Sequence, residues 1–183
     1  MEKRKNQNYS LKVTVILAML VAISIVSGKY LAIRGGDIMR FSLENMPIIF
    51  AGMAFGPVAG GAVGLVADLV GCIMVGYTIN PIVALGAATI GIISGIASRL
   101  LKKTKLDSRF ITVITVAAAH IVGSIIIKTF GLASYYDISF PVLLLWRILN
   151  YLIVGTLDGV ILHILLNNKG IRMHIKEIGG KEE

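Results

Sequence analysis

The sequence predicts an all-α integral membrane protein with six transmembrane helices and both termini in the cytoplasm. Of its 183 residues, 56% are hydrophobic and only 15% are charged, and the mean hydropathy is +0.82. A soluble domain carries about 25% charged residues, so this deficit indicates a bilayer. Lysine and arginine gather at both termini and in residues 100–109, where the positive-inside rule expects cytoplasmic cations.

A helix of about 20 apolar residues can cross a membrane, and the chain has room for about six of them in a single membrane domain, 1–183. The expected helices cover residues 12–30, 41–54, 57–75, 81–101, 110–131 and 140–166, between cytoplasmic tails over residues 1–11 and 167–183. The second helix, residues 41–54, is short for a full span.

The first helix is expected to be retained, because no small-x-small cleavage pattern follows its apolar run at a polar boundary. Its Ala18 and Ala22 form an A-x-x-x-A pattern, which favours close helix packing. The outer loop that follows carries Lys29, Arg34 and Arg40, against the positive-inside rule. Either this loop binds an anion, or the larger cytoplasmic clusters outweigh it.

The second and third helices are expected to meet at a sharp turn, Gly56-Pro57, because proline at the first helical position needs no N–H partner. Gly56, Gly60, Gly64 and Asp68 then recur every four residues on one helix face. The glycines predict close packing against a neighbouring helix, with a buried carboxylate at the end of the seam.

The fourth helix is expected to begin after Asn80, whose side chain could cap it or could contact a heteroaromatic ligand. Gly91 and Gly95 form a second small-residue seam, for which internal packing is the default interpretation. Four aromatic residues lie in or beside the outer loops. Either they form the aromatic belt common at that depth, or they offer a stacking platform for a flat ring. They are Tyr77, Tyr135, Tyr136 and Trp146.

Ionisable residues inside the expected spans are costly in lipid and face the protein interior. From the helical rise, Lys128 and Arg147 lie roughly 27 to 28 Å above the cytoplasmic side. With Arg40 they could form an outward-facing anion site, and Asn150 follows Arg147 by three residues on the same face. The alternative is that Lys128 and Arg147 extend to lipid headgroups.

Asp68 and His120 both lie near the midplane by the same measure. They could form a proton relay, but a buried polar pair joining the third and fifth helices is the favoured interpretation. Asp158 and His163 lie nearer the inner end, where packing or interfacial roles are expected.

Several classes of function are excluded or disfavoured by missing patterns. The sequence has no P-loop, no H-E-x-x-H and no G-x-S-x-G, so we expect no catalytic residue and no enzyme activity. Cys72 is the only cysteine, which leaves no cysteine-rich metal site, and we expect neither a metal nor a cofactor. Because the cations flank the membrane spans, nucleic-acid binding is not expected.

The run LENMPIIFAGMAFGPVAGGAVGLVADLVG (residues 43–71), with GYTINPIVALGAATIGIISG after it, resembles the folate family of S components. S components are the substrate-binding membrane subunits of energy-coupling factor (ECF) transporters. The later segments HIVGSIIIKTFGL and LLLWRILNYLIVGTLDGVIL are similar to the same family.

This resemblance implies the six-helix S-component fold, with a vitamin pocket on the outer side, in a bacterial cell membrane. It also implies an ABC importer in which a transmembrane coupling subunit and two ATPase subunits are partners, and in which Ala18 and Ala22 contact the coupling subunit. Folate is the expected vitamin. Another small anionic vitamin, or a stand-alone proton-coupled carrier, is the alternative.

Folate has a dianionic glutamate tail, which suits the cations, and a flat pterin ring, which suits the aromatic and amide side chains. The residues expected to bind the ligand are Arg40, Glu44, Asn45, Tyr77, Asn80, Lys128, Tyr135, Trp146, Arg147 and Asn150.

Overall fold

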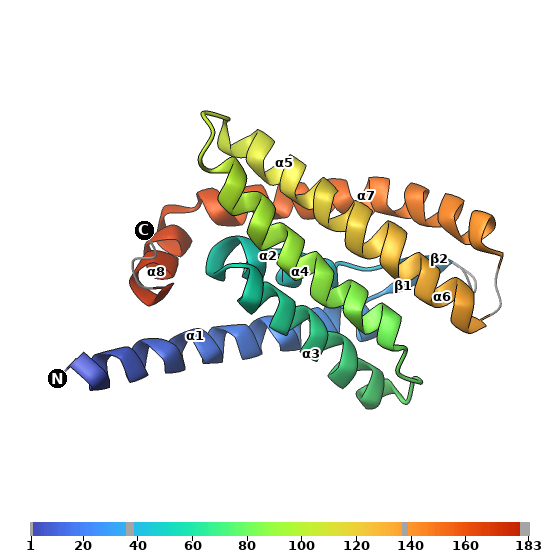
Figure 1. The fold of residues 1–183 in the computed structure, drawn as a ribbon, viewed down its shortest axis with the longest axis horizontal. Helices are drawn as coiled ribbons and strands as arrows, with labels where there is room; N and C mark the ends of the chain where they lie inside the picture. Colours follow the sequence, from blue (N-terminus) through green and yellow to red (C-terminus); the bar gives the residue numbers. More distant parts are fainter. Residues whose placement is uncertain (1, 36–38, 137–138, 180–183) are drawn as a thin grey trace.

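The computed structural model describes residues 2–35, 39–136 and 139–179, most of which are helical. Five helical runs in these ranges are long and apolar enough to cross a membrane, which confirms the expected all-α membrane fold. The elements are α1 (Glu2–Ile25), the π-helix η1 (Val26–Tyr30), β1 (Ile33–Gly35), β2 (Met39–Phe41), α2 (Asn45–Phe55), α3 (Pro57–Val75), α4 (Pro81–Leu101), α5 (Ser108–Ala119), the π-helix η2 (His120–Lys128), α6 (Thr129–Tyr136), α7 (Phe140–Asn167) and α8 (Lys169–Gly179) (Figure 1).

The second helix differs most from the expectation. It begins at Asn45 rather than at residue 41, because β2 takes up residues 39–41 and pairs antiparallel with β1. Its 11 residues rise roughly 16 Å, about half the thickness of the hydrocarbon core. Within the described residues the bundle therefore has six apolar helical segments, of which five are long enough to span.

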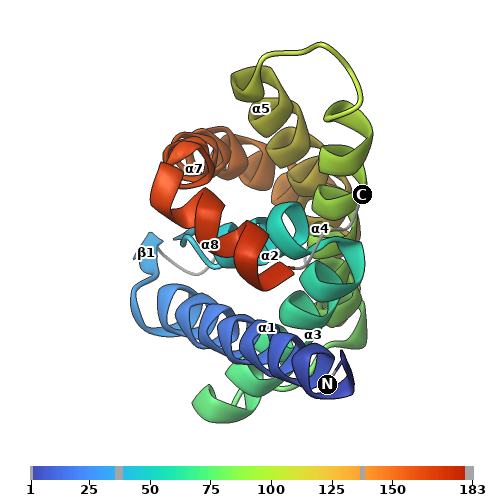
Figure 2. The same ribbon diagram turned by 90° about the vertical axis from the view of Figure 1, so that its left-hand side faces the viewer.

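Both expected tails contain helix. α1 already begins at Glu2, and α8 occupies most of the predicted C-terminal tail. The first residues of α1 and the helix α8 lie at the same end of the bundle (Figure 1). Figure 2 looks onto this end and shows α8 crossing it, and α8 contacts α1, α2 and α7.

α3 and α4 occupy the predicted residues, and α7 ends one residue beyond the predicted end. The fifth span is longer than expected. It continues through η2 and α6 to Tyr136, five residues past the end expected at residue 131. The π-helical segment places His120 and Lys128 on a locally widened turn, a feature common at functional sites.

The turn between α2 and α3 forms where the sequence predicted it. Gly56 has φ 99°, a conformation that side-chain-bearing residues rarely adopt, and Pro57 begins α3. This turn folds α2 back along α3, and the buried core gathers around Ile48, Ile49 and Ile90.

The glycine seam packs α3 against α4 at backbone contact. A Cβ built on Gly60 would lie 2.6 Å from the carbonyl oxygen of Gly91, and one built on Gly91 would lie 2.0 Å from the carbonyl oxygen of Gly60. Gly64 meets the carbonyl of Ala87 in the same way. Both predicted seams are thus halves of one internal interface, which carries Asp68 at its outer end.

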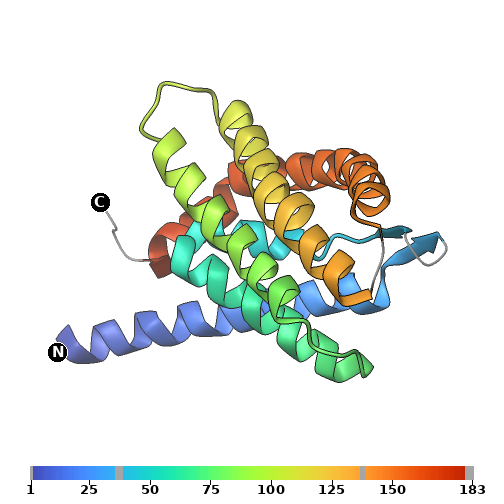
Figure 3. The same cartoon turned by 45° about the vertical axis from the view of Figure 1, so that its right-hand side comes forward.

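The strands β1 and β2 lie at the end of the bundle opposite to α8 (Figure 3). The α3–α4 connection, residues 76–80, lies at this same end. We call it the outer end, because the cationic connection between α4 and α5 lies at the other one (Figure 1).

We predict that Gly91→Ala destabilises the protein by at least about 1 to 3 kcal/mol, because its methyl group would overlap a backbone carbonyl that cannot move independently. Thermal unfolding in detergent micelles, followed by circular dichroism, measures the effect. The matched control is Gly159→Ala in α7, where an added Cβ meets nothing within 4 Å. That variant should be neutral or slightly stabilised. Equal losses in both variants would contradict the close contact.

Candidate ligand-binding site

A cavity of about 200 Å³ opens at the outer end of the bundle. Its walls come from η1, β2, α3, the α3–α4 connection, α4, η2, α6 and α7 and from the segment leading into α2. The lining residues are Lys29, Arg40, Ser42, Glu44, Asp68, Cys72, Tyr77, Thr78, Asn80, Val83, Lys128, Leu132, Trp146, Arg147, Asn150 and Tyr151.

Most of the residues that the sequence singled out lie around this one space. Lys128 and Arg147 both line the cavity instead of extending to lipid headgroups. Eight of the ten predicted residues share the lining: Arg40, Glu44, Tyr77, Asn80, Lys128, Trp146, Arg147 and Asn150.

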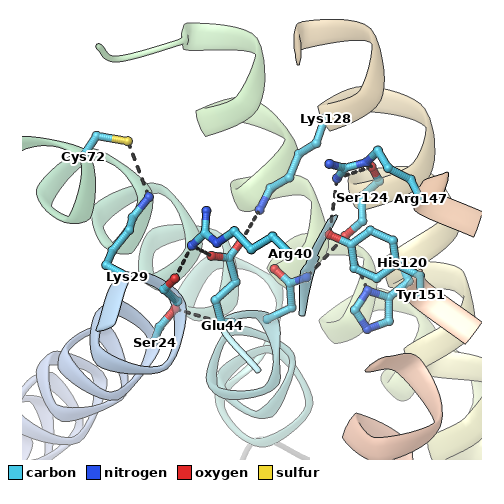
Figure 4. A network of polar contacts seen from close by, with 12 residues as sticks. Ser24, Lys29, Arg40, Glu44, Cys72, His120, Ser124, Lys128, Arg147 and Tyr151 are labelled. Atoms are coloured by element: carbon cyan, nitrogen blue, oxygen red, sulfur yellow. Dashed lines mark hydrogen bonds and ion pairs between the residues drawn. The ribbon is translucent and has the colours of Figure 1, made fainter. Parts of the chain in front are cut away.

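Glu44 is the centre of the polar network (Figure 4). It lies at the N-terminal end of α2, where its carboxylate accepts a hydrogen bond from Arg40 Nη2 at 3.0 Å and from Lys128 Nζ at 3.3 Å. Lys128 is almost fully buried. Burial disfavours the charged carboxylate, but the nearby cations, Lys128 foremost, outweigh it and lower the pKa of Glu44 to about 2.

The backbone around Glu44 and Arg40 is fixed from three sides. Ser24 Oγ donates to the Glu44 carbonyl at 2.7 Å, and Arg40 Nη2 donates to the Gly28 carbonyl. Asn150 Nδ2 donates to the Arg40 carbonyl at 2.7 Å. β2 is thereby tied to η1 and α7, and Glu44 is tied to α1, so Arg40 and Glu44 are held in a defined geometry.

Arg147 is oriented by the π-helical segment. Its Nε and Nη2 donate to the Ser124 carbonyl at 3.2 and 2.9 Å, and its guanidinium carbon lies 5.3 Å from the Tyr151 ring centre (Figure 4). Asn80 caps α4, as one interpretation expected, since its Oδ1 accepts from the backbone N–H of Ile82 and Val83.

Three polar atoms at the cavity wall are buried and have no hydrogen-bond partner among the described residues: Arg40 Nε, Asp68 Oδ2 and Asn150 Oδ1. Buried polar groups are nearly always paired, because an unpaired one costs about 1 to 3 kcal/mol. One donor and two acceptors are therefore free for a polar ligand.

The lining is cationic overall and partly aromatic. Lys29, Arg40, Lys128 and Arg147 stand against the two carboxylates Glu44 and Asp68, a formal excess of two positive charges. Tyr77, Trp146 and Tyr151 add flat apolar surface. Such a site fits an anion that also carries a ring.

Two predicted binding residues lie elsewhere. Asn45 is buried beneath the cavity and donates to Ser124 Oγ at 3.4 Å, because it sits in the first turn of α2. Tyr135 lies near the end of α6 with an exposed ring. The side chains of Arg34 and Tyr136 lie outside the described part of the chain.

His120 has a different partner from the one expected. Its Nε2 lies 3.0 Å from Asp158 Oδ2 in the buried interior, and Nδ1 lies 3.4 Å from Ser124 Oγ. None of the described contacts joins His120 to Asp68, so the proposed relay is not formed. Asp158 is a fully buried tie between α7 and η2 rather than an interfacial group.

Sequence reasoning did not assign Lys29, Asp68, Cys72 or Tyr151 to the site. Lys29 Nζ lies 3.7 Å from Cys72 Sγ and 5.7 Å from the Tyr77 ring centre. Two signals were present: Lys29 belongs to the outer cations that oppose the positive-inside rule, and Tyr151 follows Arg147 by one helical turn.

The comparisons with known proteins now decide the class. Residues 8–171 match the sequence family described as ECF-type riboflavin transporter, S component. The chain belongs to this family. It is thus an S component, the substrate-binding membrane part of an ECF transporter for a vitamin. Comparison with curated proteins gives no match.

Solved S components share the fold. The crystal structure of FolT bound with folic acid has a TM-score of 0.68 and 21% identity, covering 84% of this chain and 92% of FolT. The S component for biotin from an ECF-type ABC transporter has a TM-score of 0.69 and 19% identity, covering 92% and 98%. A structure described as the S component of a bacterial ECF transporter has a TM-score of 0.67, 20% identity, and coverage of 91% and 99%.

These neighbours bear on the vitamin in different ways. The family description names riboflavin, whereas the resemblance found in the sequence was to folate S components. The named ligands of the solved structures are folic acid and biotin. At about 20% identity, these structures establish the S-component fold and leave the vitamin to be argued from the cavity.

The lowered pKa of Glu44 predicts a definite pH dependence of stability. Because the folded-state pKa lies below the ordinary value of 4.5, the ionised carboxylate stabilises the fold above pH 4.5, and this stabilisation is lost as the pH falls toward 2. Glu44→Gln should therefore lower the Tm at pH 7, and the difference from wild type should shrink between pH 4.5 and 2. A Tm difference that stays constant over this range would contradict the ion-pair network.

Proposed function

We propose that this S component binds folate at its outer end and delivers it inward together with a coupling subunit and two ATPase subunits in a bacterial cell membrane. The excess of cationic side chains in the cavity carries this proposal. Folate presents two tail carboxylates and a flat heteroaromatic ring. Arg40, Lys128 and Arg147 suit the carboxylates, and Tyr77 and Trp146 suit the ring.

The solved neighbours support the choice in part. FolT bound with folic acid shares the fold over most of both chains. Biotin carries one carboxylate but no aromatic ring, so the three aromatic side chains of the cavity would have less to contact. Riboflavin is the second candidate, because the matched family is described by it. Riboflavin is uncharged at neutral pH and makes no use of the cationic excess.

Titrating the purified protein with folic acid, riboflavin and biotin, by calorimetry or tryptophan fluorescence, tests this assignment. We expect folic acid to bind most tightly, and Arg147→Ala to weaken its binding by about 1.5 to 3 kcal/mol through loss of a charge-assisted contact. Arg109→Ala, at the opposite end of the fifth span, is the matched control and should leave affinity unchanged. Tighter binding of riboflavin, with no effect of Arg147→Ala, would defeat the folate proposal.

Partner docking is proposed for the exposed face of α1. Ala18 and Ala22 both lie on the outside of the bundle, one helical turn apart, beside the exposed side chains of Val15 and Met19. Small residues on such a face let another helix approach closely. Because Ala18 and Ala22 are exposed, this face of α1 is available for packing against the coupling subunit.

The double variant Ala18→Trp, Ala22→Trp should keep folate affinity unchanged but abolish ATP-driven uptake in vesicles that contain all the subunits. Two indole rings prevent close helix approach without reaching the cavity. The control is the double variant Leu85→Trp, Ile96→Trp, at two exposed positions of α4. Loss of ligand binding in the α1 variant would show that the face belongs to the internal fold, and uptake by the chain without partners would favour a stand-alone carrier.

A further inference from the structure

Asp68 is the one cavity carboxylate that no described hydrogen bond satisfies in full. It lies on α3 at the end of the glycine seam, and its Oδ2 is buried without a partner. The other carboxylate, Glu44, accepts from both Arg40 and Lys128. Glu44 is therefore occupied by the protein itself, whereas Asp68 keeps an acceptor available to a ligand.

Asp68 also marks the floor of the cavity. Below it lies a second, small space of about 10 Å³, and this space shares Lys29, Glu44, Asp68 and Lys128 with the main cavity. A volume of this size holds about one water molecule, and a ring cannot enter it. A ligand that fills the main cavity therefore ends beside Asp68.

The floor presents a mixed set of donors and acceptors. The ammonium groups of Lys29 and Lys128 can only donate, and an ionised Asp68 can only accept. A complementary ligand edge must therefore carry an acceptor next to hydrogen-bond donors.

Building on the proposed function, we infer that Asp68 selects the ring of the ligand by accepting paired hydrogen bonds from a ring N–H and an adjacent amino group. A 2-amino-4-oxopteridine has this edge: its N3–H and 2-amino group form a donor pair that matches a carboxylate in bidentate fashion. The neighbouring 4-oxo group is an acceptor, which Lys29 on the floor can satisfy.

The same geometry rejects a flavin ring. The corresponding edge of an isoalloxazine has one N–H between two carbonyl groups, so a carboxylate meets an oxygen where the pteridine offers an amino group. Sites built to hydrogen-bond a group discriminate strongly, because the wrong ligand leaves buried polar atoms unpaired or opposed. Asp68 would thus separate pteridine from flavin within one S-component fold.

The inference is tested with the wild-type protein and Asp68→Asn, titrated with folic acid and with its analogue lacking the 2-amino group. In the wild type, removal of the amino group should weaken binding about 10- to 100-fold, as expected for a hydrogen bond to a charged group. Asp68→Asn should weaken the binding of folic acid by a similar factor. The variant protein should bind folic acid and the analogue nearly equally. The compound 4-aminobenzoyl-glutamate, which lacks the pteridine, should bind both proteins alike.

Asp107→Asn is the matched control, because this aspartate caps α5 at the opposite end and asparagine can keep the cap. If wild type does not bind folic acid, the proposed function fails. If wild type binds folic acid and the analogue equally, the function stands and the role of Asp68 is refuted. That comparison needs no variant, so it holds even if Asp68→Asn fails to fold. An effect of Asp68→Asn that is equal for all three ligands would also refute ring selection.

Discussion

The structure depends on how an apolar bundle holds charge. Four cationic side chains reach one outer cavity, and such groups are tolerated in a membrane protein only when they are paired or face a polar space. Glu44 meets this requirement for Arg40 and Lys128 at once. It sits where the β1–β2 segment enters α2. Its carboxylate joins β2 to η2, and its backbone carbonyl accepts a hydrogen bond from Ser24 of α1.

The cavity lining contains both polar groups that are paired within the protein and polar groups that are available to a ligand. Glu44 pairs with both Arg40 and Lys128. The four cations of the lining still outnumber its two carboxylates by two formal charges, which an anion can use. Arg40, Asp68 and Asn150 each present one buried polar atom without a described partner. The polar network therefore fixes the cavity residues in place, and three polar atoms remain available to a ligand, as in a preorganised site.

The secondary structure followed closely from local chemistry. Gly56-Pro57, Asn80-Pro81 and the four-residue glycine repeat have meanings that depend only on neighbouring residues, and each appears where it was predicted. The wrong predictions concern the bounds of two helices, the start of α2 and the end of the fifth span. Strand pairing displaced the first residues of α2, and the fifth span continued through the π-helix η2 and α6 past Gly131. Neither is visible in a hydropathy pattern, because both depend on long-range contacts or on backbone geometry.

The sequence by itself determined the membrane class and the apolar helices, and it predicted that Lys128 and Arg147 lie at matching heights, because hydropathy, glycine spacing and helical rise act along the chain. Only the tertiary structure decided the partners. His120 contacts Asp158 and not Asp68, and Asn45 is buried against Ser124. Asp68 lines the floor of the cavity. Depth fixes the height of a residue in the bilayer but not its direction around the helix axis relative to neighbours. That direction is set by how the helices pack.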